Sequence, residues 1–452
     1  MTIPFTITPD RRRFLGATAS AFAALAASGC MNRGAPAGKS RAGAADSGFG
    51  GYGALVPDRA GLLDLPEGFF YRVVSRLGDR MDDGGTVPDR ADGMGCFDIG
   101  NGEIALVRNH ELQPHHDAGG PIAKGFGKRN GVFVPGGTTT IVLDAATLAV
   151  KRQFRSLAGT IRNCAGGVTP WGTWLSCEEA PTGPGQRYGD GLERNHGWVF
   201  EVPATAPGLV DAVPLTAMGR FNHEAAAVDP ATGIVYMTED RDDGVLYRFL
   251  PNTPGKLAEG GRLQAMVIDG MADTRNWNSP AMPVGQSYPV SWVDLNDVEA
   301  PKDDLRQRAA DKGAALIARG EGLHMGTGEV FACASSGGAK ELGQIFKLTP
   351  GLAGAPDRVE LFFESESTDQ FNFGDNLTVA PNGHLIVCED QYTDEVDNHL
   401  RGVTPQGRAY EFARLRIQTE PAGACFSPDG KWLFVNAYSP TATLAITGPW
   451  TA

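Results

Sequence analysis

Several protein classes are excluded by what this sequence lacks. After residue 30 it has no apolar run close to the about 20 residues that a membrane helix needs. It has neither a Gly-x-Ser-x-Gly nucleophile elbow nor a phosphate-binding loop that ends in Lys-Ser or Lys-Thr. Basic residues are outnumbered, with 40 Lys and Arg against 53 Asp and Glu. The resulting net charge of −13 argues against binding to nucleic acids or anionic membranes.

Cysteine is also scarce, and six of the seven cysteines follow Cys30. An even number of cysteines in an exported chain permits disulfides. However, Cys177 and Cys388 hold the same place in a repeated motif, and Cys96 and Cys425 fall within predicted strands. We therefore interpret these four as small buried apolar side chains rather than bridges.

One short motif recurs six times along the chain. Each copy predicts a strand, a turn rich in Pro, Asp, Asn or Gly, and a second strand. Four copies have an acid or a cysteine at both ends, and the ends of an antiparallel hairpin lie side by side. Each copy therefore brings its end groups to one rim. The copies span residues 95–111, 164–179, 224–240, 321–335, 375–390 and 423–436.

Six hairpins with further short strands between them predict an all-β fold, a six-bladed β-propeller with loop and helix insertions. The alternative is a two-sheet sandwich, but six near-equivalent hairpins favour radial closure. A parallel α/β fold is disfavoured because the strands do not alternate with helices. The largest insertion contains a loop at residues 270–302 and a predicted helix from Asp303 to Ala318. An insertion beside a rim often forms a lid.

The N-terminus predicts export. An arginine pair at positions 11–12 precedes Phe14-Leu15 and an Ala-rich apolar run, which matches a twin-arginine signal peptide over residues 1–30. Residues 31–51 are rich in Gly, Ala and Ser and predict a flexible linker. Residues 52–452 then form a single propeller domain.

The expected location is periplasmic or extracellular, reached through the twin-arginine translocase. The four residues that end at Cys30 resemble a lipoprotein cleavage box except at the first position, so lipidation of Cys30 stays open. Such a lipid would be the chain's membrane attachment, and the chain is expected to be a monomer.

Acidic residues gather at the predicted rim. Clustered carboxylates either take up protons or bind cations, and with this many acids several cations are the simpler answer. Oxygen ligands suit Ca²⁺ or Mg²⁺, whereas a thiolate suits a transition metal such as iron. Bound cations would also give this acidic protein a locally positive pocket. The candidate metal ligands are Cys164, Glu178, Glu179, Glu224, Glu239, Glu321, Asp375, Glu389 and Asp390, with Glu111 and Asp240 as further rim acids.

Two other residues are candidates for substrate contact. Arg319 lies two residues before Glu321 and can reach an anion held on the metals, although it also fits a basic helix end. Asn109, beside Glu111, can supply a neutral oxygen. Nearby histidines match no standard zinc spacing, and we interpret them as non-ligands: His110, His115 and His116.

At these positions the chain resembles the PhoX family of exported alkaline phosphatases. The matching segments cover most of the mature chain in the expected order: residues 109–111, 163–167, 176–179, 220–240, 319–322, 343–346 and 375–390. The resemblance implies a six-bladed propeller with two Fe³⁺ ions and two or three Ca²⁺ ions at one channel mouth, and an oxo group that bridges the irons and a calcium. It also implies that Cys164 ligates iron, that Arg319 contacts phosphate, and that four acids ligate metals: Glu179, Glu224, Glu321 and Asp375.

The predicted activity is hydrolysis of small phosphate monoesters outside the cytoplasm. A metal-bound oxo or hydroxide would attack in line, with Glu224 holding metal and Arg319 holding a non-bridging oxygen. This mechanism needs no protein nucleophile. Two alternatives stay open: a calcium-dependent lactonase or phosphotriesterase-like propeller, and a non-catalytic binding propeller that calcium stabilises.

Overall fold

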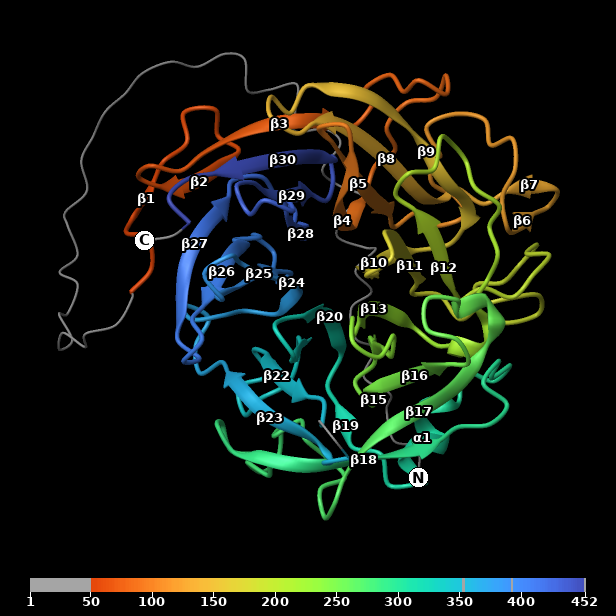
Figure 1. Cartoon of the computed structure of the whole chain (residues 1–452), viewed down its shortest axis with the longest axis vertical. Helices are drawn as coiled ribbons and strands as arrows, with labels where there is room; N and C mark the ends of the chain where they lie inside the picture. Colours follow the sequence, from red (N-terminus) through yellow and green to blue (C-terminus); the bar gives the residue numbers. More distant parts are fainter. Residues whose placement is uncertain (1–49, 352–353, 392, 451–452) are drawn as a thin grey trace.

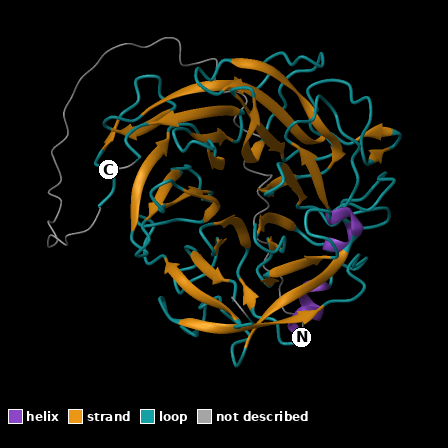
Figure 2. Cartoon of the chain, in the orientation of Figure 1, coloured by secondary structure: helices purple, strands orange, loops and turns teal. Residues whose placement is uncertain are grey.

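The computed structural model describes residues 50–351, 354–391 and 393–450. The predicted signal peptide and nearly all of the predicted linker lie outside these residues. Figure 1 shows small antiparallel sheets arranged around a central opening, and Figure 2 shows the few helical segments on one side of the ring. No helix within the described ranges is long and apolar enough to cross a membrane. The prediction of an all-β, propeller-like fold is confirmed.

The six sequence repeats form six antiparallel hairpins, and the first strand of each lies nearest the centre (Figure 1). Each first strand contacts the next one around the ring, and the last contacts the first. The hairpins are β4–β5 (Ala91–Gly100, Glu103–His110), β10–β11 (Asn163–Val168, Thr173–Glu178), β13–β14 (His223–Val228, Val235–Glu239), β20–β21 (Gly320–Met325, Val330–Ala334), β24–β25 (Gly374–Val379, Leu385–Glu389) and β28–β29 (Pro421–Phe426, Leu433–Ala437).

Outer strands extend these hairpins, and the ring is closed where β3 pairs with β30, so that the two ends of the described chain meet. In hairpin order the outer strands are β8 (Gly136–Asp144) and β9 (Val150–Thr160); β12 (Val199–Pro203); β16 (Tyr247–Pro251), β17 (Gly261–Ile268) and β18 (Ser287–Asp294); β22 (Gln344–Thr349) and β23 (Asp357–Glu364); β26 (His399–Val403), β27 (Ala409–Leu415), β2 (Leu63–Pro66) and β1 (Leu55–Val56); β30 (Ala442–Thr447) and β3 (Phe70–Arg76).

The prediction of six separate blades is wrong, because the six hairpins do not each form a separate sheet of about four strands. Within the described residues, four sheets have four or more strands, and the second hairpin carries a sheet of only three. The third and fourth hairpins share one nine-stranded sheet, because β18 pairs with β17 on one side and with β23 on the other. This bridging strand lies inside residues 270–302, which the sequence predicted to be a loop.

The predicted helix is also much shorter than expected. Only α1 (Leu305–Ala310) is helical, and the chain leaves the helical path at Gly313, which has a φ of 90°. The following residues form β19 (Leu316–Ile317), which pairs with β15 (Gly244–Val245). Strand pairing thus outcompetes the helical pattern after residue 313. The remaining elements are β6 (Lys128–Arg129), β7 (Val132–Phe133), and the short 3₁₀ segments Thr216–Met218 and Leu257–Glu259.

Apolar side chains fill the spaces between neighbouring sheets. Phe221, Tyr247 and Phe249 of the third hairpin region, for example, pack in one buried cluster with Cys177 from the second. Cys177, Cys388 and Cys425 are buried free thiols, as predicted, whereas Cys96 is only partly buried. No disulfide joins cysteines in the part of the chain that the structure describes.

One irregularity recurs in five of the six hairpins and prepares the central site. In these five, the strand register shifts just after the first residue of the inner strand, so the second residue drops out of the ladder. In the sixth hairpin the second residue, Ala422, stays paired with Asn436, and the shift follows it. Such a bulge bends the strand and re-aims a side chain. The residues placed in this way, called the bulge residues below, are Asp92, Cys164, Glu224, Glu321 and Asp375, and Ala422 is their counterpart in the sixth repeat.

The inner strands approach one another so closely that small residues must follow the bulge residues. A Cβ atom on Gly93 would lie 2.5 Å from the Cα of Ala165, and a Cβ atom on Gly322 would lie 2.5 Å from the carbonyl oxygen of Asp375. Real Cβ atoms do not approach other atoms this closely, so glycine is required at both positions. The same close approach brings the bulge residues of neighbouring hairpins together.

Candidate metal centre

All five bulge residues carry an acid or a thiol, and they converge at the centre of the ring. With two acids from the hairpin ends they form three overlapping groups, and the ligand atoms within each group lie within 4.8 Å of one another. All of these side chains are buried. The groups, called the acid–thiol centre below, are Asp92–Glu111–Cys164, Cys164–Glu179–Glu224 and Glu224–Glu321–Asp375.

The electrostatics of this centre fit cation binding. Glu224 is 0% exposed, and neither of its carboxylate oxygens has a hydrogen-bond partner. Burial, and next the nearby Glu321 and Asp375, raise the pKa of Glu224 well above its ordinary value. A buried carboxylate without donors is costly unless it is protonated or binds a cation.

The thiol in the centre widens the choice of metal. Burial, followed by the charges of Asp92 and Glu224, raises the pKa of Cys164 well above its ordinary value. Its Sγ lies 3.4 Å from Oδ2 of Asp92. A donor set of several carboxylates and one sulfur fits a hard cation together with a transition metal.

A second feature recurs in every repeat: a backbone hydrogen bond joins the loop before each hairpin to the residue after it. In all six repeats the backbone N–H of the residue after the hairpin donates to a carbonyl two positions before the bulge residue, or before its counterpart Ala422, at 2.8–3.3 Å. The six loops are therefore structurally equivalent. The donor and acceptor pairs are Glu111–Arg90, Glu179–Arg162, Asp240–Asn222, Ser335–Arg319, Asp390–Phe373 and Tyr438–Glu420.

This equivalence places three arginines at matching positions around the rim. Arg90, Arg162 and Arg319 all have left-handed backbone conformations, with φ values of 58°, 50° and 52°. The guanidinium of Arg319 donates from Nε to Asp240 at 2.8 Å, and its Nη2 lies 2.8 Å from Glu321. The guanidinium of Arg162 donates from Nε to Glu111 at 2.8 Å and also pairs with the Glu179 carboxylate.

Arg162 therefore stands beside the acid–thiol centre in the same way as the predicted phosphate-contacting Arg319. Both side chains are slightly exposed, 13% and 16%, so a ligand above the acids can reach them. The prediction from sequence did not name Arg162, although it lies two residues before Cys164 as Arg319 lies two residues before Glu321.

Asn222 contributes a neutral oxygen at the same rim. Its Nδ2 donates to Glu179 at 3.3 Å, and its buried Oδ1 has no hydrogen-bond partner. Because Asn222 takes the place that arginine takes in three other repeats, its Oδ1 is available to a cation or a donor group on a substrate.

Three predicted metal ligands face away from the centre. They are the last residues of their hairpins, and neighbours in a strand point to opposite sides. Each carboxylate is occupied by protein donors. Glu178 accepts bonds from His196 and from three backbone N–H groups, Glu239 from Tyr247 and Arg306, and Glu389 from Arg401, His399 and two backbone N–H groups.

The other predicted rim acids lie just outside the three ligand groups. Asp240 binds the guanidinium of Arg319, and Asp390 is buried at the end of the fifth hairpin. Glu111, predicted only as a rim acid, belongs to the first ligand group.

The side-chain amide of Asn109 is fully used in hydrogen bonds within the protein. Its Nδ2 donates to the carbonyl oxygens of Cys164 and Ala165 at 3.0 and 2.7 Å, and its Oδ1 accepts from Trp174 and Ser176 at 2.9 and 2.8 Å. With both ends of the amide used in this way, Asn109 fixes the bulge that carries Cys164 instead of meeting a substrate.

Asp92 was missed by the sequence analysis, although a signal was present. The first copy of the motif was started at Gly95, three residues too late to include the bulge position. The pair Asp92-Gly93 matches Glu321-Gly322, an acid followed by the glycine that close strand approach requires. Of the histidines, His110 is held between the carbonyl of Asp89 and the hydroxyl of Thr139, at 2.9 Å each, and belongs to none of the ligand groups.

Comparisons with known proteins agree with this architecture. A family model described as "Alkaline phosphatase PhoX" matches residues 50–441. No curated protein matches the chain. Among solved structures, Pseudomonas fluorescens PhoX in complex with vanadate, a transition state analogue, matches with a TM-score of 0.67 and 20% identity, covering 86% of this chain and 96% of that one.

Weaker matches include other proteins. A gluconolactonase from Xanthomonas campestris has a TM-score of 0.34 and 11% identity, covering 80% of this chain and 97% of its own. A protein of unknown function from Dyadobacter fermentans has a TM-score of 0.44 and 9% identity, covering 84% of this chain and 99% of its own. These similarities are too low to carry a functional argument.

Proposed function

The chain belongs to the PhoX family of alkaline phosphatases, which hydrolyse phosphoric monoesters, and on that premise we propose that its activity depends on metals held in the acid–thiol centre. The observation that carries the proposal is the environment of Glu224, a fully buried carboxylate surrounded by other acids and lacking any hydrogen-bond donor. Such a group needs a cation to be charged at neutral or alkaline pH.

The proposed cofactors are two Fe³⁺ ions and two or three Ca²⁺ ions. The mixed donor set supports both types of ion, since Cys164 suits iron and the carboxylates suit calcium. When bound, these cations supply Lewis acidity, which neutralises phosphoryl charge and activates the attacking group. We assign the ligand roles to the residues that meet in the centre: Asp92, Glu111, Cys164, Glu179, Glu224, Glu321 and Asp375.

The chain's own residues then bind and orient the substrate. Arg319 and Arg162 stand at equivalent positions beside the ligand acids and can each donate to a phosphoryl oxygen. Asp240 and Glu111 hold these guanidinium groups in place, which limits the entropy lost on binding. Asn109 keeps Cys164 in its bulge, so the thiol stays aimed at the centre.

We further propose that the enzyme works outside the cytoplasm as a monomer, after the twin-arginine route has exported its propeller domain, residues 52–452, together with the linker; lipidation of Cys30 stays open. The arginine pair at positions 11–12 and the following apolar run support this location. Folding before export would allow the metals to be loaded inside the cell.

Hydrolysis of p-nitrophenyl phosphate at alkaline pH, with bound metals measured on the same samples, tests the proposal. We expect activity in the wild type and loss of both metal and activity in Glu224→Gln. Inactive wild-type protein with its metals bound would overturn the phosphatase proposal. Full activity after complete removal of metals would overturn the metal dependence alone.

A further inference from the structure

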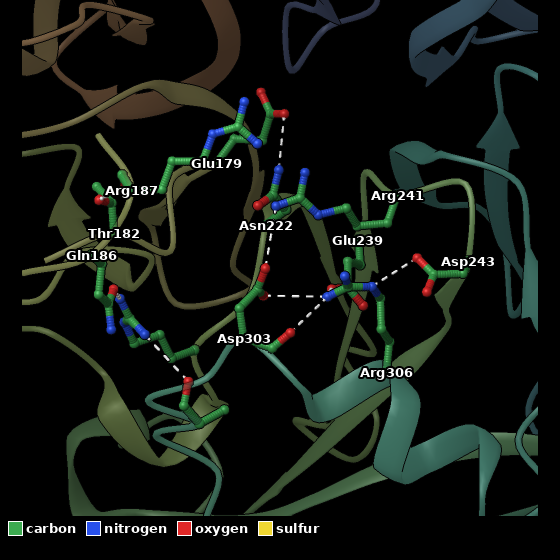
Figure 3. Close-up of polar contacts among 12 residues, drawn as sticks. Glu179, Thr182, Gln186, Arg187, Asn222, Glu239, Arg241, Asp243, Asp303 and Arg306 are labelled. Atoms are coloured by element: carbon green, nitrogen blue, oxygen red, sulfur yellow. Dashed lines mark hydrogen bonds and ion pairs between the residues drawn. The ribbon is translucent and has the colours of Figure 1, made fainter. Parts of the chain in front are cut away.

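Two insertions and the connection after the third hairpin meet beside the acid–thiol centre, where Arg187 and Arg241 approach it (Figure 3). The first insertion joins β11 to β12 and carries Gln186 and Arg187. The second precedes α1 and carries Pro301 and Asp303. They are locked together because the Gln186 side chain donates to the carbonyl of Pro301 at 2.8 Å.

Arg187 extends toward Glu179, a member of the acid–thiol centre (Figure 3). It lies on the exposed part of the first insertion and stacks against Tyr188, with its guanidinium 4.7 Å from the ring centroid. Within the described residues Arg187 makes no ion pair. Its charge is therefore free to meet an anionic group on a ligand.

Arg241 approaches the same place from the other side, next to Asn222 (Figure 3). Its backbone carbonyl accepts a bond from the N–H of Arg319 at 2.8 Å, so it neighbours the proposed phosphate-binding arginine. Its side chain is 38% exposed and lies 3.3 Å from Asp303. Asp303 is shared with Arg306, also at 3.3 Å, and the Nε of Arg241 has no hydrogen-bond partner.

These two guanidinium groups differ from the other arginines of the rim. Arg162 and Arg319 are engaged by acids of the rim, whereas Arg187 and Arg241 have hydrogen-bond donors without partners. Arg187 lies on the first insertion, and Arg241 lies in the short connection between β14 and β15. Arginine recognises carboxylate and phosphate groups through paired N–H donors. In a protein with a net charge of −13, two arginines that have unpaired hydrogen-bond donors and lie beside the same centre indicate an anion-binding site.

We propose that Arg187 and Arg241 form a second anion subsite, on the leaving-group side, that binds a carboxylate or phosphate of the substrate. The preferred substrates are then phosphate monoesters whose leaving group carries its own negative charge. This inference rests on the proposed phosphatase activity and adds the substrate class to it.

The test compares two substrates that differ in one group. The leaving group of 3-phosphoglycerate carries a carboxylate, whereas that of glycerol 3-phosphate carries a neutral alcohol at the same carbon. We would measure kcat/KM for both substrates in the metal-loaded wild type and in Arg187→Gln and Arg241→Gln. The matched control is Arg262→Gln, since Arg262 is an exposed arginine of β17 that pairs with Asp294 at 3.4 Å.

We expect the wild type to prefer 3-phosphoglycerate and each variant to lose about tenfold of that preference, while the control keeps it. An equal kcat/KM for the two substrates in the wild type would overturn the inference and leave the phosphatase proposal intact. So would a loss of the same factor on both substrates in the variants, since it would mean a general defect. Hydrolysis of neither substrate by the metal-loaded wild type would overturn the phosphatase proposal and this inference with it.

Discussion

Two sets of buried carboxylates lie at the same rim and differ in what surrounds them. Glu178, Glu239 and Glu389 end their hairpins and face protein donors. Glu224, in a bulge, meets Glu321 and Asp375 and has no donor at all. Because both sets are buried, burial alone does not identify the metal site. The supply of hydrogen-bond donors separates these three structural carboxylates from Glu224.

The strongest test of this difference is to neutralise one of the carboxylates at the bulge positions. Glu224→Gln removes the ligand that two of the three groups share. We expect the bound metal to be lost and kcat/KM to fall by at least about a thousandfold, or about 4 kcal/mol of transition-state stabilisation. Metal analysis and p-nitrophenyl phosphate kinetics on the same preparation check this. A metal-replete, active variant would remove Glu224 from the centre.

The matching change in the other set should act on stability instead. Glu389→Gln leaves the buried guanidinium of Arg401, only 7% exposed, without its carboxylate partner. We expect the free energy of unfolding to fall by about 3 kcal/mol while the metal content stays the same. Urea unfolding with metal analysis measures both.

A control for this change lies on the same histidine. Glu411→Gln removes an acid that is 43% exposed and pairs with His399 at 3.0 Å, so it should change stability by less than about 0.5 kcal/mol. If Glu389→Gln lost metal at unchanged stability, Glu389 would belong with the ligands, as the sequence had predicted.

The sequence predicted the hairpins and the acidic rim because both follow from local rules. Alternation and turn residues mark each hairpin, and hairpin ends lie together. Local rules do not say which of two adjacent acids turns inward. Glu178 and Glu179 were both predicted as ligands, and the bulge and the register decide that only Glu179 joins the centre.

The errors in the fold have the same origin. Pairing of β18 with β23 joins two hairpins that are far apart in the chain, and no local pattern in residues 270–302 announces it. The helical pattern after Asp303 is real, but Leu316 and Ile317 gain more from pairing with β15 than from a longer helix. In both cases, strand pairing between distant parts of the chain determined the structure that forms.

The pH dependence of stability offers a third comparison between the two sets. Burial raises the pKa of Glu239 to about 7, although Arg306 works against the shift. A carboxyl with a raised pKa in the folded state stabilises the fold at acidic pH, and that contribution is lost as pH rises through 7. For the metal-free protein we expect this group to cost about 2 kcal/mol of stability between pH 5 and pH 8.

Glu239→Gln should flatten that dependence, because a glutamine does not ionise. Urea unfolding of chelator-treated protein at pH 5 and pH 8 measures the difference. An equal change in stability for the variant and the wild type would mean that Glu239 keeps an ordinary pKa and is not part of the titrating set.

The smallest expected effect concerns the equivalence of Arg162 and Arg319. Both guanidinium groups are held by rim acids at matching repeat positions, so each should donate to the phosphoryl group. Replacing either by lysine keeps the charge and loses the paired donors, which should cost about tenfold in kcat/KM, mostly through KM. Inhibition by inorganic phosphate should weaken to the same extent, since phosphate uses the same donors. The third equivalent residue, Arg90, lies 3.2 Å from the hydroxyl of Tyr438 and serves as the comparison, with a smaller effect expected. If Arg162→Lys lost metal while Arg319→Lys did not, the main task of Arg162 would be to fix the ligand acids Glu111 and Glu179, and the repeat symmetry would be structural rather than catalytic.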